Sequence, residues 1–222
     1  MICVGNFKHN DKFSPEQIER IELNGNRFYQ TPAGILPSVT SVTGWEKQKE
    51  FAQWRKNNPE ESERVCLRGT NLHKIIENYL NNDQVCIEQP SKENELFLLM
   101  KKEIDRINNI HALETSLWSK TIGLAGRVDC IGEYRKDLCV IDFKGSTRSK
   151  RKEDIENYFL QACAYALMWQ DLSGEKCNKL CIIMGSETGL CQVFLENTID
   201  YVKKLHNCIK IYKKYNEIPT IR

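Results

Sequence analysis

The chain has 222 residues, of which 41% are hydrophobic and 28% charged, so it is long enough to bury one substantial core. Its formal net charge of only +2 excludes proteins that bind polyanions through an overall basic surface, so a nucleic-acid site must come from local clustering. Ten cysteines would suit a short secreted scaffold, but this chain is not short and no signal or transit peptide is evident. Reduced thiols in a cytoplasmic protein are expected. No apolar run approaches the about 20 residues of a membrane helix, so no membrane partner is expected.

The first part of the chain is expected to be irregular up to about residue 43, with turns near Pro32 and Pro37 and a β-prone run over residues 38–42. From about residue 44 to 109 the pattern changes to helices. Apolar residues recur at helical spacing over residues 60–80 and again over residues 92–108.

The second part predicts a sheet followed by alternating elements. Residues 112–143 are strand-like, broken by Gly123, Gly126 and a polar turn at residues 134–137. A helix over about residues 153–169 comes next. Two strands and a final helix then follow, near residues 180–184, 191–195 and 198–215.

One loop and the element order complete the prediction of the fold. The loop at residues 185–189 contains glycine but lacks the Gly-Lys-Ser/Thr ending of a phosphate-binding P-loop, so a plain hairpin turn is expected. The order of elements predicts a single α/β domain over residues 1–222. Within it, residues 1–60 are expected to form an N-terminal extension and residues 61–215 the core.

Two aspartates and a lysine lie on neighbouring predicted strands. If residues 135–136 are a two-residue hairpin loop, the register places Asp129 opposite Asp142. Lys144 lies on the same side of its strand as Asp142, because side chains alternate between the two faces. The alternative is a surface hairpin with solvated charges. Against it, both aspartates have apolar neighbours in sequence, where an unpaired carboxylate is costly.

This acidic pair predicts a metal site. Two close carboxylates repel each other, and a hard divalent cation that prefers oxygen ligands is the natural partner. Mg²⁺, or Mn²⁺, would neutralise them and polarise a phosphate, while Lys144 would orient a water or stabilise developing negative charge. The pattern therefore favours phosphodiester hydrolysis.

Two helical segments carry further polar residues that also permit ordinary structural roles. Gly69 and His73 share one face of the first long helix, and a glycine inside a helix hints at a close backbone approach. His73 alone could equally be a structural histidine. Gln161 and Tyr165 share a face of the later helix, either as site residues or as core packing with a polar fringe.

Basic residues cluster beside the acidic pair in sequence. The loop after the second strand could contact backbone phosphates or simply be a solvated charged loop; its basic residues are Arg148, Lys150, Arg151 and Lys152. Arg68 and Arg127 are further candidates for DNA binding.

Aromatic residues in the N-terminal helical part offer another nucleic-acid contact. Trp45, Trp54 and Arg55 could stack on unpaired bases, although core packing is the more common role of tryptophan. No base-reading motif is present, so sequence specificity is not expected.

Taken in order, these segments resemble a known family. They are similar to the RecB-type exonucleases of the PD-(D/E)XK superfamily, phage-encoded and mitochondrial enzymes included, in Gly69-Thr70-x-x-His73, Glu114, Gly126-x-Val128-Asp129, Asp142-x-Lys144 and Gln161-x-x-x-Tyr165. The resemblance covers about residues 27–170. It implies a restriction-endonuclease-like α/β core, with a central mixed β-sheet flanked by helices and an N-terminal helical extension.

The same resemblance implies roles for individual residues. The metal ligands would be His73, Asp129, Asp142 and the carbonyl of Phe143, with Lys144 as the catalytic lysine. Glu114, Gln161 and Tyr165 would support the site or hold the substrate. Where close relatives often continue Lys-Thr-Ser, this chain has Lys144-Gly145-Ser146. The missing hydroxyl is expected to weaken a substrate contact, and Ser146 is kept as a DNA contact.

The function implied is a Mg²⁺-dependent exonuclease acting on DNA ends, with single strands favoured, in phage or organellar-type replication, recombination or repair. A structure-selective endonuclease or resolvase could use the same site. A DNA-binding module of this fold that has lost turnover is an alternative from another class. A globular protein with no nucleic-acid role is the third.

Overall fold

A mixed β-sheet forms the centre of the molecule. The computed structural model describes residues 1–10, 12–23, 25–87 and 90–218, and within these the sheet has five strands in the order β10-β9-β8-β7-β6. The strands are β6 (Ile107–Ser119), β7 (Leu124–Tyr134), β8 (Asp137–Ser146), β9 (Lys179–Ser186) and β10 (Leu190–Asn197). Neighbours are antiparallel except β8 and β9, which run parallel. The expected central mixed sheet is confirmed.

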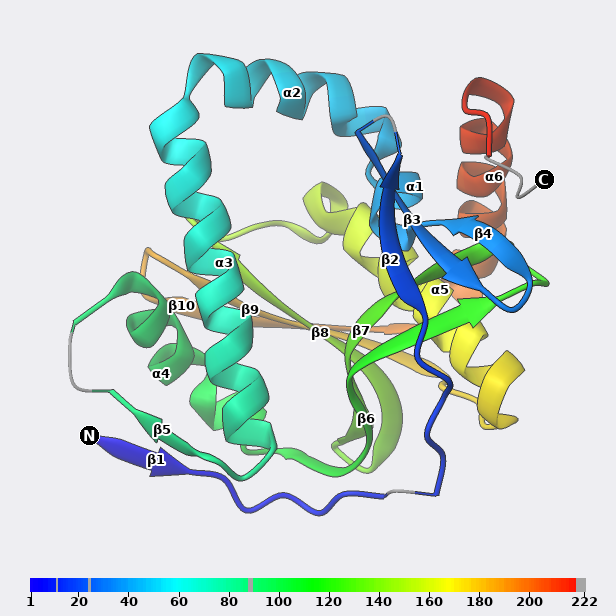
Figure 1. Ribbon diagram of the computed structural model, residues 1–222. Helices are drawn as coiled ribbons and strands as arrows, with labels where there is room; N and C mark the ends of the chain where they lie inside the picture. The colour runs from blue at the N-terminus through cyan, green and yellow to red at the C-terminus, as the bar shows by residue number, and fades with distance from the viewer. Residues whose placement is uncertain (11, 24, 88–89, 219–222) are drawn as a thin grey trace.

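Helices cover both faces of this sheet (Figure 1). One face packs against α3 (Pro59–Leu80) and α4 (Lys92–Ile104), and the other against α1 (Val39–Thr43), α5 (Glu156–Ser173) and α6 (Ile199–Tyr215). Consecutive residues of β8 alternate between the two buried clusters, Val140 on the α5 side and Ile141 on the α3 side. Because both faces are buried, β9 reads as a nearly continuous apolar run, and so does β8 from Leu138 to Ile141. No helix in the described part of the chain is long and apolar enough to cross a bilayer.

Local sequence explains where the long helices begin and end. Pro59 stands in the first turn of α3, where its missing N–H costs nothing. The Ser91 side chain caps α4 by accepting a hydrogen bond from the Asn94 amide, and Gly174 ends α5 with a φ of 79° that glycine adopts freely. The helices predicted over residues 60–80, 92–108, 153–169 and 198–215 are confirmed, the second and third with shifted ends.

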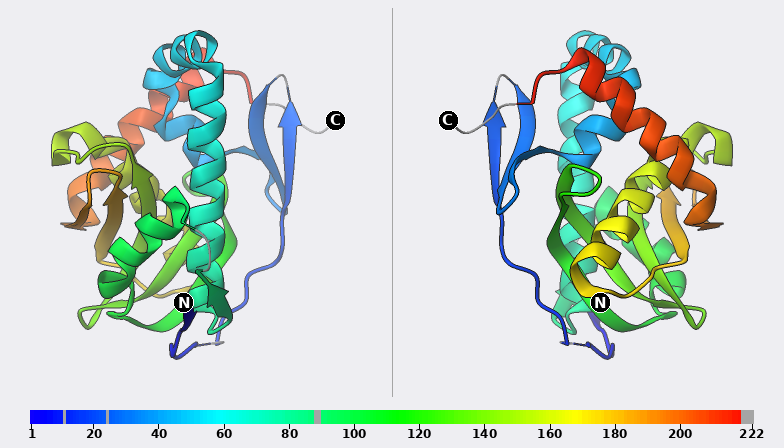
Figure 2. Two further views of the ribbon diagram at one scale, coloured as in Figure 1. Left: turned by 90° about the vertical axis from the view of Figure 1, so that its left-hand side faces the viewer. Right: turned by 90° about the vertical axis from the view of Figure 1, so that its right-hand side faces the viewer.

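The N-terminal region is more ordered than the sequence suggested. It forms β1 (Ile2–Val4), which pairs with β5 (Gln84–Cys86), and a small sheet of β2 (Glu19–Leu23), β3 (Asn26–Thr31) and β4 (Gly34–Pro37). Figure 2 shows this small sheet beside the core, with α2 (Gln48–Asn57) bridging from α1 to the top of α3. The expectation of an irregular segment up to residue 43 is therefore wrong.

The β-prone run at residues 38–42 is helical instead, in α1. Val39 and Val42 are fully buried against the α5 and α6 side of the core. Burial on one face of a helical turn outweighs the weak strand preference of valine and threonine.

The hairpin between β7 and β8 has the predicted register, with Tyr134 opposite Asp137. Arg135 and Lys136 have φ values of 53° and 78°, so both adopt the left-handed conformation that a two-residue type I′ turn requires. The loop at residues 185–189 is also the expected hairpin turn, joining antiparallel β9 and β10. All ten cysteines are free thiols, as expected.

Candidate active site

The central sheet splits between β7 and β8, and the candidate site lies at the split. In the described chain, pairing of these two strands ends at Cys130 and Ile141. Beyond that point β7 pairs with β6 and bridges to Ser38 at Ala125, while β8 pairs with β9. Asp129 and Asp142 are the first residues past the last pair. The carboxylate of Asp129 bridges the split, because its Oδ2 accepts a hydrogen bond from the Phe143 amide at 2.9 Å. This bond satisfies a backbone N–H that has no partner on β7 once the strands separate.

Asp142, which is buried, and Lys144, which is partly buried, form an ion pair. The ammonium of Lys144 lies 2.6 Å from each carboxylate oxygen of Asp142 and donates its hydrogen bond to Oδ1. Asp142 Oδ2 receives no hydrogen bond from any residue that the structure describes. Burial raises the pKa of Asp142 to about 6 despite the opposing effect of Lys144. Burial alone would lower the pKa of Lys144, but Asp142 and Asp129 outweigh it, so the lysine is charged at neutral pH.

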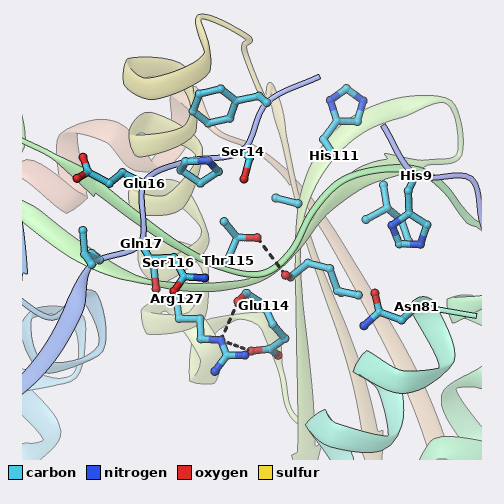
Figure 3. A pocket seen from close by; sticks show the side chains of 16 residues that line it. His9, Ser14, Glu16, Gln17, Asn81, His111, Glu114, Thr115, Ser116 and Arg127 are labelled. Carbon is cyan, nitrogen blue, oxygen red and sulfur yellow. Dashed lines mark hydrogen bonds and ion pairs between the residues drawn. The ribbon is translucent and has the colours of Figure 1, made fainter. Parts of the chain in front are cut away.

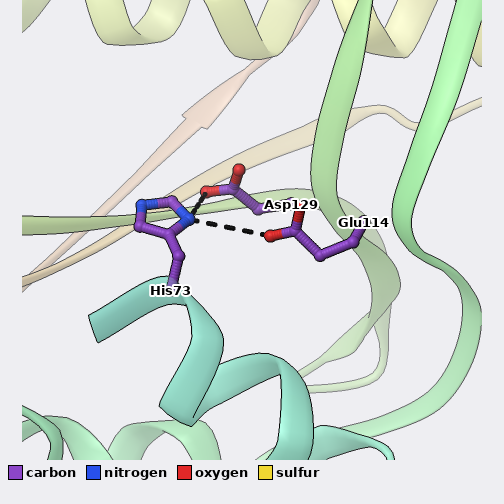
Figure 4. A group of neighbouring side chains, drawn as sticks. All are labelled: His73, Glu114 and Asp129. Carbon is purple, nitrogen blue, oxygen red and sulfur yellow. Dashed lines mark ion pairs between the residues drawn. The ribbon is translucent and has the colours of Figure 1, made fainter. Parts of the chain in front are cut away.

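A second group brings a histidine and two carboxylates together (Figure 4). Nδ1 of His73, on α3, lies 3.5 Å from Asp129 Oδ2 and 3.7 Å from Glu114 Oε1. The ligand atoms of His73, Glu114 and Asp129 all lie within 4.8 Å of one another. Asp129 raises the pKa of His73 to about 9, assisted by Glu114 and opposed by burial and Lys144. This nitrogen and oxygen donor set suits a divalent cation.

Glu114 reaches this group through an unusual backbone conformation. Its flanking residues in β6 pair with β7, Leu113 with Cys130 and Thr115 with Val128, but Glu114 itself has a φ of 46°. A left-handed φ in a non-glycine residue costs about 1–2 kcal/mol, and such irregularities in strands re-aim a side chain. Arg127 holds the backbone and side chain of Glu114 in place, because its Nε lies 2.9 Å from Glu114 Oε2 and donates to the Glu114 carbonyl at 2.8 Å.

Helix α5 closes the site from the opposite face of the sheet. Tyr165 is 2% exposed, and burial raises its pKa well above the usual value, while a hydrogen bond with Gln161 opposes the rise. Its ring lies against β7 where Gly126 leaves space. A Cβ added at Gly126 would stand 2.9 Å from the Tyr165 hydroxyl and 3.0 Å from its ring. Gly126 therefore sets the close approach of α5 to the strand that carries Asp129.

Gly126→Ala is expected to displace Tyr165 and to loosen α5 over the site. Overpacking of this kind costs about 1–3 kcal/mol of unfolding free energy, and we expect cleavage to fall by roughly tenfold. Thermal unfolding and a cleavage assay measure the two effects. Gly69→Ala is the matched control for stability, because an added Cβ there meets no described atom within 4 Å and should stabilise helix α3 by up to about 1 kcal/mol. Equal unfolding free energies for the two variants would contradict the packing role of Gly126.

The space around two glycines differs from what the sequence suggested. Gly69 has open space around it, so the close backbone approach inferred from its place in a helix is wrong for the described chain. Gly145 faces the core, since an added Cβ would lie 3.2 Å from Leu72 and 3.3 Å from Leu96. The residue that replaces threonine here thus has a packing role between α3, α4 and β8.

The predicted DNA-binding residues lie in different environments. Arg68 is buried and forms an ion pair with Glu187, and its guanidinium donates to the Gly145 carbonyl at 3.3 Å. Ser146 is also buried, and its hydroxyl donates to the Arg148 carbonyl at 2.6 Å. Neither side chain faces solvent.

The loop after β8 presents its basic residues unevenly. Arg151 pairs with Asp154, and Lys152 with Glu196. The side chains of Arg148 and Lys150 make no ion pair with any described residue, although the Lys150 backbone is fixed by two hydrogen bonds with Gln192. Arg148 and Lys150 are therefore the members of this loop whose charges are uncompensated.

A groove of about 760 Å³ borders the site along β6 (Figure 3). Glu114 and Arg127 lie at its boundary with the site, and residues 13–18 of the N-terminal segment form its opposite wall. The groove extends from the candidate active site toward His111 and His9.

Sequence reasoning did not assign a role to Tyr158. Its ring, on α5, lies 5.2 Å from the Lys144 ammonium, a cation–π distance. The signal was present, because Tyr158, Gln161 and Tyr165 recur at spacings of three and four and so share one helix face. Glu114 was expected to support the site or hold the substrate and was not among the predicted metal ligands, whereas its carboxylate belongs to the group around His73.

Comparisons with known proteins show what this chain is similar to. The family model of the PD-(D/E)XK nuclease superfamily matches residues 100–199, which include every site residue on the sheet and α5 but not His73. Among curated proteins, mitochondrial genome maintenance exonuclease 1 of Homo sapiens is 30% identical over 154 residues, 59% of this chain and 43% of the human protein. The Mus musculus protein of the same name is 29% identical over 119 residues, 52% of this chain and 32% of the mouse protein.

The chain thus spans less than half the length of these relatives. A crystal structure of a provisionally named exonuclease from Eubacterium rectale superposes on 68% of this chain and 65% of its own chain, with a TM-score of 0.44 and 11% identity. This likeness is too distant to bear on function.

Proposed function

We propose that this chain, in which residues 100–199 match the family model of the PD-(D/E)XK nuclease superfamily, is a metal-dependent deoxyribonuclease that removes nucleotides from DNA ends, with single-stranded ends favoured. One observation carries the proposal: the Asp142–Lys144 pair and the His73–Glu114–Asp129 group meet where β7 and β8 separate. Such an activity would serve DNA replication, recombination or repair.

The residues at the split fit a divalent cation. His73, Glu114 and Asp129 offer one nitrogen and two carboxylate donors within 4.8 Å. Asp142 would add a further oxygen, because its Oδ2 accepts no hydrogen bond from the described residues, although it lies 2.6 Å from the Lys144 ammonium. The Phe143 carbonyl is a further predicted ligand. When bound, Mg²⁺ or Mn²⁺ would supply Lewis-acid polarisation of the scissile phosphate and lower the pKa of a bound water. Without the ion, Lys144, Arg127 and the protonated His73 compensate the three carboxylates, and a bound cation would take over the role of the proton on His73.

Lys144 would act on the reacting groups. Its ammonium has three N–H donors, of which Asp142 accepts one in a hydrogen bond. A remaining donor can hold a water or stabilise negative charge on a phosphate oxygen. Asp142 and the ring of Tyr158 fix the position of Nζ, so little reorganisation is needed when substrate binds.

Metal binding is expected to tighten as pH rises from 7 to 9. The pKa of His73 is raised to about 9, and a protonated imidazole cannot be a ligand, so the ion must displace a proton. The apparent affinity for Mn²⁺, measured by calorimetry without DNA, should rise by up to about tenfold per pH unit in this range. His73→Gln should bind Mn²⁺ more weakly and lose this dependence. A flat profile for the wild type would remove His73 from the ligand set.

The same pKa has an opposite consequence for the metal-free fold. Since the folded value is raised above the usual 6.5, protonated His73 stabilises the metal-free protein fully below about pH 6.5. That contribution is lost as pH rises through about 9. The ion and the proton therefore compete for one place beside Asp129.

A nuclease assay tests the proposed function. Linear and circular single-stranded DNA, labelled at an end or internally, is incubated with the protein in Mg²⁺, in Mn²⁺ and in a chelator. We expect nucleotides to be released from the linear strand only, and only with a divalent ion. Cutting of the circle would show a structure-selective endonuclease instead, and an inert linear strand in both metals would contradict the proposal.

A further inference from the structure

A second groove, which is rich in arginine, lies away from the candidate active site, between α2 and the small N-terminal sheet. Its volume is about 420 Å³, and its lining includes Arg20, Arg27 and Arg55 together with the hydroxyls of Thr40 and Ser41 and the ring of Phe51. None of the described residues that build the active site contributes to this lining. Figure 1 shows the elements concerned, β2, β3, α1 and α2, together at the top of the molecule.

The arginines of this groove differ from most others in the chain. Six of the arginines that the structure describes form ion pairs: Arg64, Arg68, Arg106, Arg127, Arg135 and Arg151. In the described chain four do not, namely Arg148 and the three that line this groove. Glu22 stands opposite Arg27 in the strand register, but one carboxylate cannot offset three guanidinium groups. The excess positive charge favours an anionic occupant.

An exposed aromatic ring accompanies these charges. Phe51 is 52% exposed, and it lies on the face of α2 that also carries Arg55 four residues later. Trp54, three residues after Phe51, is also exposed. Guanidinium groups beside an exposed ring are the combination by which proteins bind single-stranded nucleic acid, through phosphate contacts and base stacking.

The groove is connected structurally to the active site. In the register of β2 and β3, Arg20 stands opposite Tyr29 and Glu22 stands opposite Arg27. Both arginines therefore share one face of the small sheet with Tyr29. Tyr29 is buried. Burial of Tyr165 and the nearby Asp129 raise the pKa of Tyr165, and Tyr29 raises it further. Ser38 forms a bridge to Ala125, and Asp129 lies four residues further along β7, about 13 Å at the rise of a strand.

We propose that this groove is a second contact region for the DNA strand, in which Arg20, Arg27 and Arg55 bind backbone phosphates and Phe51 stacks on an unpaired base. The inference rests on the proposed function, since it takes DNA as the substrate. It gives the preference for single strands a physical basis, because stacking on Phe51 requires a base that is free of its partner. The occupant is an internal stretch of the strand rather than its terminal phosphate.

Binding measurements in a chelator test this inference without cleavage. Fluorescence anisotropy records the affinity for a 3′-labelled single-stranded oligonucleotide, with or without a 5′-phosphate, over a series of salt concentrations. Each lost phosphate contact lowers the slope of log K against log salt by about 0.7, so Arg20→Ala/Arg27→Ala/Arg55→Ala should lower it by about 2. Phe51→Ala should weaken binding by roughly tenfold at fixed salt. Both effects should be the same for the two oligonucleotides.

Two further variants control for a general loss of positive charge and for misfolding of the triple variant. Arg106→Ala removes an exposed arginine at the end of α4 and should leave affinity and slope unchanged. Arg55→Ala alone removes an exposed side chain without threatening the fold, and should lower the slope by about 0.7.

The outcomes separate this inference from the proposed function. If the triple variant and Arg55→Ala keep the wild-type affinity and slope, the groove is not a DNA contact, even where the nuclease assay succeeds. A loss confined to the 5′-phosphorylated strand would also overturn it, in favour of a terminal-phosphate pocket. If the wild-type protein neither binds nor cleaves DNA, both the inference and the proposed function are wrong.

Discussion

Lys144→Ala is expected to lower the rate of DNA cleavage by about 10²- to 10³-fold, the usual effect of removing one donor that stabilises developing charge. The loss should lie in kcat rather than in KM, because the ammonium is held by Asp142 inside the site and does not lie on the surface where DNA docks. Single-turnover cleavage of an end-labelled strand under saturating Mg²⁺ measures it directly.

Lys144→Ala also removes the only ion-pair partner of Asp142 in the described structure. Breaking a buried pair by removing one partner can cost about 3–5 kcal/mol, although Asp142 can escape part of this by taking up a proton. Its pKa, already raised to about 6, should rise further. Lys144→Gln keeps a hydrogen-bond donor next to Asp142 and loses the charge. If the glutamine variant folds stably and cleaves as fast as the wild type, the proposed role of Lys144 is wrong.

Asp129→Asn is expected to abolish cleavage at ordinary metal concentrations while preserving the fold. The amide oxygen of asparagine can still accept the hydrogen bond from the Phe143 amide, so the bridge across the split survives. The charge beside His73 is lost, and we expect the affinity for Mn²⁺ to fall by at least about 10- to 100-fold. Calorimetry for the metal and an end-release assay for cleavage report the two effects.

An independent readout follows from the titration of His73. Asp129 is the largest cause of its raised pKa, so the asparagine variant should move that pKa from about 9 back toward 6.5, as NMR of the metal-free protein would show. Asp137→Asn is the matched control, because Asp137 is exposed at the far end of the same hairpin. An unchanged pKa in Asp129→Asn would mean that His73 and Asp129 are not close in solution.

Much of the core could be predicted from sequence because its signals are local. The period of apolar residues predicted the long helices, and the polar turn at residues 134–137 fixed the register between β7 and β8. That register, with the alternation of side chains, was enough to place Asp129 and Asp142 on either side of the same gap and Lys144 beside them. Pattern and tertiary structure agree here because both faces of β8 are buried.

The other features of the fold and of the site depend on contacts that no local sequence pattern encodes. The left-handed φ of Glu114 re-aims a side chain that ordinary alternation places elsewhere, so its approach to His73 could not be deduced. The end of β7–β8 pairing at Cys130 and Ile141 is a property of the whole sheet. Nothing in the segment around Arg68 predicts its burial, because its ion-pair partner Glu187 lies more than 100 residues away in the sequence. Likewise, α1 is helical only because α5 and α6 bury its valines.

Anomalous diffraction from crystals grown with Mn²⁺ tests most directly whether the groups at the β7–β8 split hold a divalent ion. We predict a peak between His73, Glu114 and Asp129, within about 2.0–2.4 Å of their ligand atoms, with Oδ2 of Asp142 turned toward it. Mn²⁺ bound elsewhere, with the His73 imidazole and the Asp129 carboxylate pointing apart, would contradict the account.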